Sequence, residues 1–236
     1  MPPSPRPPAS PNRLDRAPRA AAARGWFEPF PRLYAIVDVD VCATAGHPPL
    51  DVVRAFLAAG VRLIQLRAKT WESGAFLDLA AAAVAEAQAA GAVMVVNDRA
   101  DIAVLSHAPG LHVGQDDLSP VDARRLLGPD AWLGLSTHTV EQWTAALATP
   151  ISYVAIGPVF DTGTKATGFE AVGLHTVRLV ATAAAARALP VVAIGGITLE
   201  RAPEVIEAGA AAVAVISGLL AGPPEARARA FIRALA

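Results

Sequence analysis

The chain of 236 residues is poor in cysteine and carries almost no net charge. Its single cysteine, Cys42, excludes an internal disulfide framework or a cysteine-based metal site, and favours a reducing compartment. No run of about 20 apolar residues is free of charged residues or glutamine, so the pattern excludes a transmembrane helix despite a mean hydropathy of +0.40. A net charge of −1 provides no field that would attract nucleic acid or an anionic membrane.

Lysine and asparagine are so rare that their positions carry information. Lys69 and Lys165 are the only lysines among 20 basic residues, and Asn12 and Asn97 are the only asparagines. A composition rich in arginine and alanine indicates a genome that avoids lysine and asparagine codons. Where these residues persist, we therefore expect a chemical reason at that position.

Residues 1–31 differ in composition from the rest of the chain. They hold nine of the 20 prolines, and five arginines against two acidic residues give them a net charge of +3. Such a segment buries too little apolar area to offset its ordering entropy, and it lacks the apolar region of a secretory signal peptide. We expect a disordered extension over 1–31 and one folded domain over 32–236.

From residue 33 onward, short apolar runs alternate with stretches rich in helix-forming residues. The apolar runs are continuous, as expected for parallel strands covered on both faces. We predict strands at 33–37, 61–66, 92–96, 110–113, 132–135, 153–156, 191–194 and 212–216. We predict helices at 50–59, 73–90, 99–106, 119–127, 139–147, 171–187, 199–208 and 224–235. This alternation predicts an α/β fold, a single (β/α)8 TIM barrel; a doubly wound sheet is the competitor, but no GxGxxG follows the first strand.

Polar residues follow the predicted strand ends, where barrel enzymes place their active sites. Both lysines and Asn97 fall in this ring. Gln65, Arg67 and Lys69 alternate after the second strand, so their side chains point the same way. A guanidinium beside an ammonium suits a multiply charged phosphate, with a salt-bridged rim as the alternative.

Asp98 and Asp117 follow neighbouring strands at equivalent depth. Two carboxylates without a histidine or cysteine cluster suit Mg²⁺, which takes one or two carboxylates, phosphate oxygens and waters. The alternative for an aspartate after a strand is a helix N-cap. Because the pair lies opposite the basic cluster, it predicts a metal-bound diphosphate.

The last strands predict a second phosphate site. Gly195-Gly196 and residues 216–218 match the backbone-built phosphate site of many barrels, although turn glycines also occur without a ligand. The long connection 157–170 resembles a lid, and its polar side chains include Thr162, Thr164 and Lys165. Ser136 adds a hydrogen-bond donor, and His138 is either an acid–base group or a helix-start residue. Two phosphate regions facing one pocket predict two phosphorylated substrates, with diphosphate as leaving group.

Together the residues after the predicted strands resemble the sequence motifs of the thiamine-phosphate synthase family. The resemblance runs from Leu33 to about Leu220, and its strings are QLRAK at 65–69, VNDRAD at 96–101, HVGQDD at 112–117, TGTK at 162–165 and IS at 216–217. It implies coupling of 4-amino-2-methyl-5-(diphosphooxymethyl)pyrimidine to 4-methyl-5-(2-phosphooxyethyl)thiazole, giving thiamine phosphate and diphosphate. It also implies a dissociative reaction, in which diphosphate leaves before the thiazole nitrogen attacks.

The resemblance assigns roles to the rim residues. Those implied to bind the pyrimidine diphosphate are Gln65, Arg67, Lys69, Asn97, Ser136 and Lys165. Those implied to bind the thiazole phosphate are Thr162, Thr164, Gly196, Ile216 and Ser217. Asp98 and Asp117 would hold Mg²⁺, and the expected catalytic residues are Arg67, Lys69, Ser136 and Lys165.

Three other functions remain open for a barrel with phosphate sites. A thiazole tautomerase of the same superfamily, or a non-catalytic thiamine-phosphate-binding protein, would not need the full set of cations and carboxylates. A phosphate-sugar isomerase barrel would require an acid–base pair and no metal. We expect a cytoplasmic enzyme that acts on small molecules; the resemblance also allows a homo-oligomer.

Overall fold

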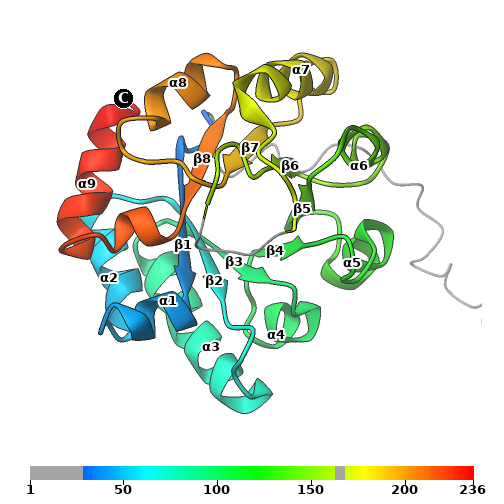
Figure 1. The fold of residues 1–236 in the computed structure, drawn as a ribbon. Coiled ribbons are helices and arrows are strands. Elements are labelled where there is room, and N and C mark those ends of the chain that lie inside the picture. Colours follow the sequence, from blue (N-terminus) through cyan, green and yellow to red (C-terminus); the bar gives the residue numbers. More distant parts are fainter. Residues whose placement is uncertain (1–28, 163–167) are drawn as a thin grey trace, which may run out of the picture.

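In a computed structural model, which describes residues 29–162 and 168–236, eight parallel strands close into one barrel surrounded by helices (Figure 1). The strands are β1 (Leu33–Asp38), β2 (Leu63–Arg67), β3 (Val93–Asn97), β4 (Gly110–Val113), β5 (Trp132–Thr137), β6 (Tyr153–Ile156), β7 (Val191–Ile194) and β8 (Ala212–Val215). Neighbours in the chain are neighbours in the sheet, and β8 pairs with β1. The predicted TIM barrel is confirmed.

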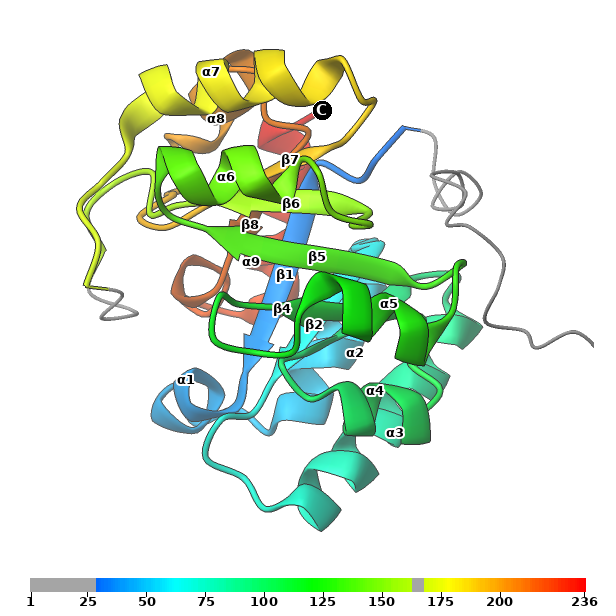
Figure 2. The same cartoon turned by 90° about the vertical axis from the view of Figure 1, so that its right-hand side faces the viewer.

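The helices form a layer outside the strands, as Figure 2 shows from the side. They are α1 (Val39–Thr44), α2 (Pro49–Ala59), α3 (Ser73–Ala89), α4 (Ala100–Leu105), α5 (Pro120–Leu127), α6 (Val140–Ala146), α7 (Gly173–Ala185), α8 (Ala202–Glu207), α9 (Pro224–Ala234) and the 3₁₀ helix η2 (Ser217–Leu219). α1 was not predicted; it follows β1 directly because Asp38 caps it. No helix of the described residues is long and apolar enough to cross a membrane.

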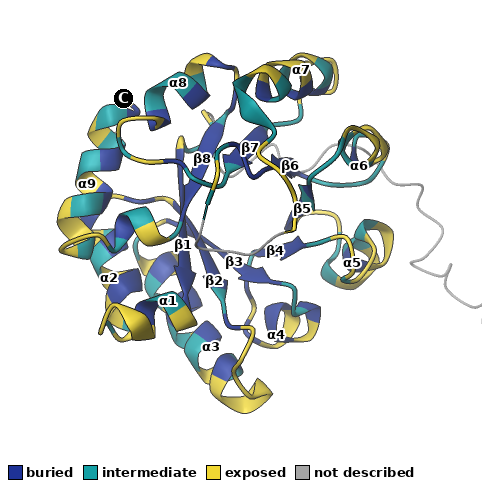
Figure 3. Ribbon diagram, viewed as in Figure 1, coloured by how far each residue is buried: buried dark blue, intermediate teal, exposed yellow. Residues whose placement is uncertain are grey.

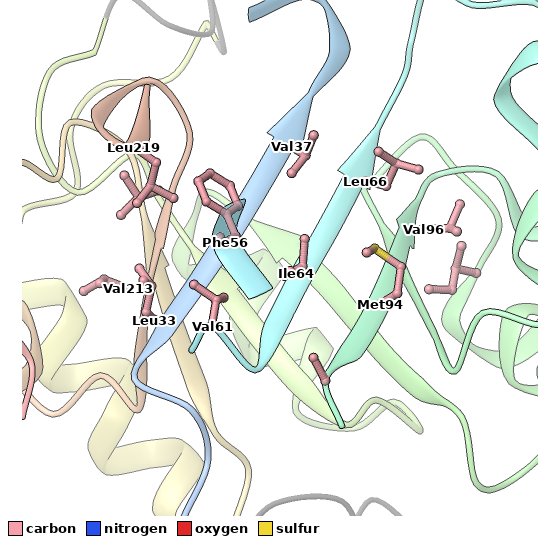
Figure 4. Close-up of a cluster of buried hydrophobic side chains, with 14 of the residues drawn as sticks. Leu33, Val37, Phe56, Val61, Ile64, Leu66, Met94, Val96, Val213 and Leu219 are labelled. Atoms are coloured by element: carbon pink, nitrogen blue, oxygen red, sulfur yellow. The ribbon is translucent and has the colours of Figure 1, made fainter. Parts of the chain in front are cut away.

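The barrel has two apolar layers, one on each face of the sheet. Alternate strand residues such as Val37 and Ile64 point outward and join a cluster that includes Phe56 of α2 (Figure 4). The residues between them, such as Tyr34 and Leu63, pack inside the barrel. The strands are therefore buried except for the half-buried Arg67, Ser136 and Ile194, and the exposed residues lie on the outer helices and loops (Figure 3). This alternation also decides which residues reach the interior at the strand ends.

The segment before β1 joins the fold earlier than expected. Residues 1–28 lie outside the described part of the chain, so the disorder expected there stays a prediction. Phe30, which the composition placed in the extension, packs against Trp132 and Tyr153, with ring centroids 5.2 and 6.0 Å away. Because Trp132 and Tyr153 begin β5 and β6, Phe30 covers the amino-terminal end of the barrel interior.

Candidate active site

Lys69 and the two predicted metal ligands, Asp98 and Asp117, come together at the carboxyl ends of β2, β3 and β4. Lys69 Nζ lies 2.8 Å from Asp98 Oδ2. The Asp98 carboxylate in turn contacts that of Asp117, in the loop after β4. Asp117 Oδ2 accepts a hydrogen bond of 2.7 Å from the Gly114 N–H, which fixes this loop. Asn97, which ends β3 just before Asp98, is buried.

The two aspartates form an electrostatically unfavourable pair. Burial raises the pKa of Asp117, and the neighbouring Asp98 carboxylate raises this pKa further. Asp98 itself adopts a φ of +62°, a left-handed conformation that is uncommon outside glycine. Its N–H donates to the His112 carbonyl at 2.8 Å, which helps to hold this conformation. Two neighbouring acids beside a single ammonium are typical of a site that binds a cation.

Arg67 pairs with an acid that the sequence analysis did not assign. Its guanidinium donates to Asp38 Oδ2, and the two side chains are only 14% and 5% exposed. The pair forms because Asp38 and Arg67 lie opposite each other in the register of β1 and β2. Arg67 Nε is buried and has no hydrogen-bond partner among the described residues. A buried donor in this state is available to a ligand.

Gln65 and Ser136 lie at the two ends of a chain of buried hydrogen bonds. Gln65 Nε2 donates to Tyr34 Oη at 2.9 Å, and the Tyr34 and Tyr153 hydroxyl oxygens are 2.8 Å apart. Tyr153 Oη lies 3.0 Å from His112 Nδ1, and His112 Nε2 lies 2.8 Å from Ser136 Oγ. The sequence pattern predicts no role for either tyrosine or for His112, because all three fall within apolar strands.

The residues predicted for the second phosphate lie in the loops after β6, β7 and β8. A Cβ on Gly196 would lie 2.5 Å from the Asp161 carbonyl oxygen, so the first two loops are in direct contact. A Cβ on Gly218 would lie 3.8 Å from the Ile197 carbonyl oxygen, which brings the third loop beside the second. The described residues predicted to bind in these loops are Thr162, Gly196, Ile216 and Ser217.

Two arginines that the sequence analysis did not single out hold the same loops. Arg201 donates to the Gly196 carbonyl at 3.3 Å, and its guanidinium carbon lies 4.6 Å from the centre of the Phe160 ring. Arg227 Nε donates to the Gly218 carbonyl at 3.0 Å. Each arginine therefore places positive charge next to a glycine of the second phosphate region.

Part of the predicted site falls in the connection between β6 and α7. Thr164 and Lys165 lie outside the described residues, so the lid expected over 157–170 stays a prediction. His138 Nδ1 lies 2.5 Å from the Gly157 carbonyl oxygen, and its ring stacks on Phe169 with centroids 4.3 Å apart. His138 thus contacts this connection at both of its described ends, which favours a structural role.

Comparison with known proteins identifies the family. The sequence profile described as thiamine monophosphate synthase matches residues 33–219. The chain belongs to the thiamine monophosphate synthase family. The thiamine-phosphate synthase of Chlorobium luteolum is 41% identical over 203 residues, covering 86% of this chain and 92% of that protein. That of Koribacter versatilis is 42% identical over 212 residues, covering 87% and 96%.

Solved structures agree with this thiamine monophosphate synthase assignment. Thiamine phosphate pyrophosphorylase from Pyrococcus furiosus has a TM-score of 0.77 and 26% identity, covering 86% of this chain and 95% of its own. Phosphoribosyl anthranilate isomerase from Thermus thermophilus has a TM-score of 0.58 at 15% identity, covering 86% and 98%, and shows the fold alone. Membership of the family confirms the predicted enzyme class, a transferase that forms thiamine phosphate.

Proposed function

We propose that this synthase joins a pyrimidine diphosphate to a thiazole phosphate at the carboxyl ends of the barrel strands. The observation that carries the proposal is the meeting of Lys69, Asp98 and Asp117, with 2.8 Å between Lys69 Nζ and Asp98 Oδ2. The bond between the pyrimidine methylene carbon and the diphosphate oxygen breaks, and both electrons leave with diphosphate. The lone pair of the thiazole nitrogen then forms the new carbon–nitrogen bond. No proton moves, so the reaction needs no general base.

The basic side chains stabilise the departing diphosphate. Departure builds negative charge on the leaving oxygens, which preorganised cations stabilise without further rearrangement. Lys69 offers its ammonium, and Arg67 offers a buried Nε–H that has no partner among the described residues. Asp38 keeps the Arg67 guanidinium in place through their buried ion pair. We assign the pyrimidine end to Gln65, Asn97 and Ser136, and a further cation to Lys165.

The acid pair fits Mg²⁺. Asp98 and Asp117 would be the protein ligands, and within the described ranges no three His, Cys, Asp or Glu side chains are grouped to hold a metal. Two carboxylates are enough for Mg²⁺, because it takes its remaining oxygens from phosphate and water. Burial and the neighbouring Asp98 carboxylate raise the pKa of Asp117, and the charge of Lys69 offsets this only in part. When bound, the ion would neutralise charge on the diphosphate.

The second phosphate region suits the phosphate of the thiazole. Glycine at 196 lets the loops after β6 and β7 pack closely, and such loops offer backbone N–H groups to phosphate in many barrels. We assign this phosphate to Thr162, Thr164, Gly196, Ile216 and Ser217. Binding at this side leaves the diphosphate to the cations at the end of β2, so the two phosphorylated groups are held apart.

The test is to mix both substrates with Mg²⁺ and measure diphosphate release and thiamine phosphate formation, then to repeat with EDTA. We expect both products with Mg²⁺, little with EDTA, and a large loss in Asp117→Asn. Asp116→Asn, at the exposed neighbouring position, is the matched control and should stay within about twofold of the parent. Absence of thiamine phosphate with Mg²⁺ would refute the function. Unchanged diphosphate release in EDTA would refute the proposed role of Mg²⁺.

We also propose that the enzyme works in the cytoplasm. Cys42 is free and buried in α1, so the described fold is held together without a disulfide. Burial, together with the charge of Asp38, raises the pKa of Cys42 to about 12, which keeps the thiol protonated. A neutral, unpaired thiol of this kind suits a reducing compartment.

A further inference from the structure

The chain of buried hydrogen bonds crosses the inside of the barrel. Tyr34 belongs to β1 and Tyr153 to β6, which are not neighbours in the closed sheet, so the bond between their hydroxyl groups spans the interior (Figure 1). The two tyrosines are 1% and 0% exposed, and His112 is 6% exposed. Barrels usually fill this space with Val, Ile and Leu. Three linked polar side chains in their place call for a reason beyond packing.

A glycine makes room for this arrangement. His112 of β4 and Tyr153 of β6 stack with ring centroids 5.6 Å apart, across β5. The residue of β5 between them is Gly134, where a Cβ would lie 2.2 Å from Tyr153 Cζ and 2.4 Å from His112 Nδ1. A side chain at this position would therefore displace the bond between tyrosine and histidine. The strand is built to let the two rings meet.

When each hydroxyl donates its one hydrogen within the chain, the donors and acceptors can run in only one order. Gln65 Nε2 is solely a donor, so the Tyr34 oxygen accepts, and the Tyr34 hydrogen then points to Tyr153. Tyr153 already accepts this hydrogen and donates its own to His112 Nδ1. A neutral imidazole that accepts at Nδ1 carries its hydrogen on Nε2, and this group donates to Ser136 Oγ.

Ser136 therefore receives a hydrogen bond from the protein and keeps its own hydrogen for a ligand. We propose that Tyr34, Tyr153 and His112 are positioning residues that make Ser136 a hydrogen-bond donor to an acceptor atom of the pyrimidine diphosphate. The inference rests on the proposed function, because that function places the pyrimidine diphosphate at Ser136. Gln65, at the other end, keeps its carbonyl oxygen for the same substrate. One chain of hydrogen bonds thus links two binding side chains on different strands.

The direct test is the tautomer of His112 in protein labelled with ¹⁵N at histidine. The chain has five histidines, and the signal that disappears in His112→Gln identifies the ring. We expect the proton of the neutral ring on Nε2 in the parent protein, and a shift toward the Nδ1 tautomer in Tyr153→Phe, which lacks the donor. A parent ring protonated at Nδ1 would show the reverse order of donors and would overturn the inference. This measurement requires no turnover.

Binding and kinetics test the role of the chain. In Tyr153→Phe we expect the Kd of the pyrimidine diphosphate, from calorimetry, to rise about tenfold, equivalent to about 1.4 kcal/mol for one oriented donor. The KM of the thiazole phosphate should stay within about twofold, because its phosphate is assigned to other loops. A general loss of packing would change both constants and would contradict a positioning role. Tyr34→Phe is the second variant, should Tyr153→Phe fold poorly.

Two substitutions at His112 form a matched pair. Gln presents an N–H near the position of the histidine Nε2 and should keep most of the affinity. Asn is similar in chemistry but too short to reach Ser136, and should lose about as much as Tyr153→Phe. Equal affinities in the two variants would refute the argument.

A double-variant cycle connects the chain to Ser136. Ser136→Ala removes the donor itself, so adding Tyr153→Phe to it should cause no further loss of affinity. Additive losses would show that the tyrosine acts by another route and would refute the inference. If the parent binds the pyrimidine diphosphate but forms no thiamine phosphate, the proposed function fails while the tautomer and the cycle still decide this inference.

Discussion

The buried ion pair of Asp38 and Arg67 leads to a quantitative prediction about stability. In Asp38→Asn, the amide keeps the shape of the side chain and can still cap α1, whose N–H groups of Asp40 and Val41 lie 3.1 and 3.2 Å from Asp38 Oδ1. What is lost is the charge opposite Arg67, whose side chain is only 14% exposed. Removing one partner of a buried pair costs about 3–5 kcal/mol, because the remaining charge is uncompensated. We expect about 3 kcal/mol here.

The assay is urea unfolding in the absence of ligands, followed by circular dichroism. An ion pair on the surface provides the control: Asp51 and Arg54 lie 3.2 Å apart with side chains 61% and 53% exposed. Asp51→Asn should leave the free energy of unfolding close to that of the parent, because solvent screens such pairs. Equal losses in the two variants would refute the argument from burial. A much smaller loss in Asp38→Asn would do the same.

Three further predictions concern the site. Asp117→Asn should stabilise the metal-free protein by about 1 kcal/mol at neutral pH, a modest value because the pair is partly solvated. The folded state raises the pKa of this carboxyl, so the gain should vanish as the pH falls below the usual aspartate pKa. Arg201→Ala should raise the KM of the thiazole phosphate about tenfold, through loss of a charge-assisted contact beside Gly196. Lys165→Ala should lower the turnover rate about 100-fold or more, as lost charge stabilisation does.

Each of these has a measurement that decides it. For Asp117→Asn this is the midpoint of thermal unfolding against pH, and a lower midpoint at neutral pH would contradict the repulsion between the two acids. For Arg201→Ala the control is Arg187→Ala. Arg187 also donates to a carbonyl oxygen, that of Leu147, but it follows α7 and lies away from the carboxyl ends of the strands. Equal KM values in these two variants would exclude a phosphate contact. A single-turnover rate unchanged in Lys165→Ala would exclude this lysine from the reaction.

The barrel was predictable because its strands are covered on both faces and its helices are separated by clear apolar runs. The same double coverage hid the interior chain. When both faces are apolar, alternation no longer shows which residues point inward, so Tyr34, His112 and Tyr153 gave no separate signal. Helix α1 was missed for a related reason, because its Val39 and Val41 continue the β-branched pattern of β1 and only the Asp38 cap ends the strand.

The cations and acids of the rim were recognisable from their rarity and their position after strands. Their partners were not, because pairing depends on register: Asp38 meets Arg67 only because β1 and β2 align at those residues. Arg201 and Arg227 escaped notice for another reason. Arginine is common in this chain, and nothing in the sequence separates the two that hold Gly196 and Gly218 from those on outer helix faces.

The packing of Phe30 limits where the chain can be shortened. A protein beginning at residue 29 keeps the ring that rests on Trp132 and Tyr153, whereas one beginning at residue 32 loses it. The second truncation would let solvent reach Tyr153, which orients His112, through the amino-terminal end of the barrel. The hydroxyl hydrogen of Tyr153 should then exchange with solvent more rapidly, and substrate affinity should fall although every rim residue is intact. The few residues before β1 therefore shield the base of the catalytic barrel from solvent.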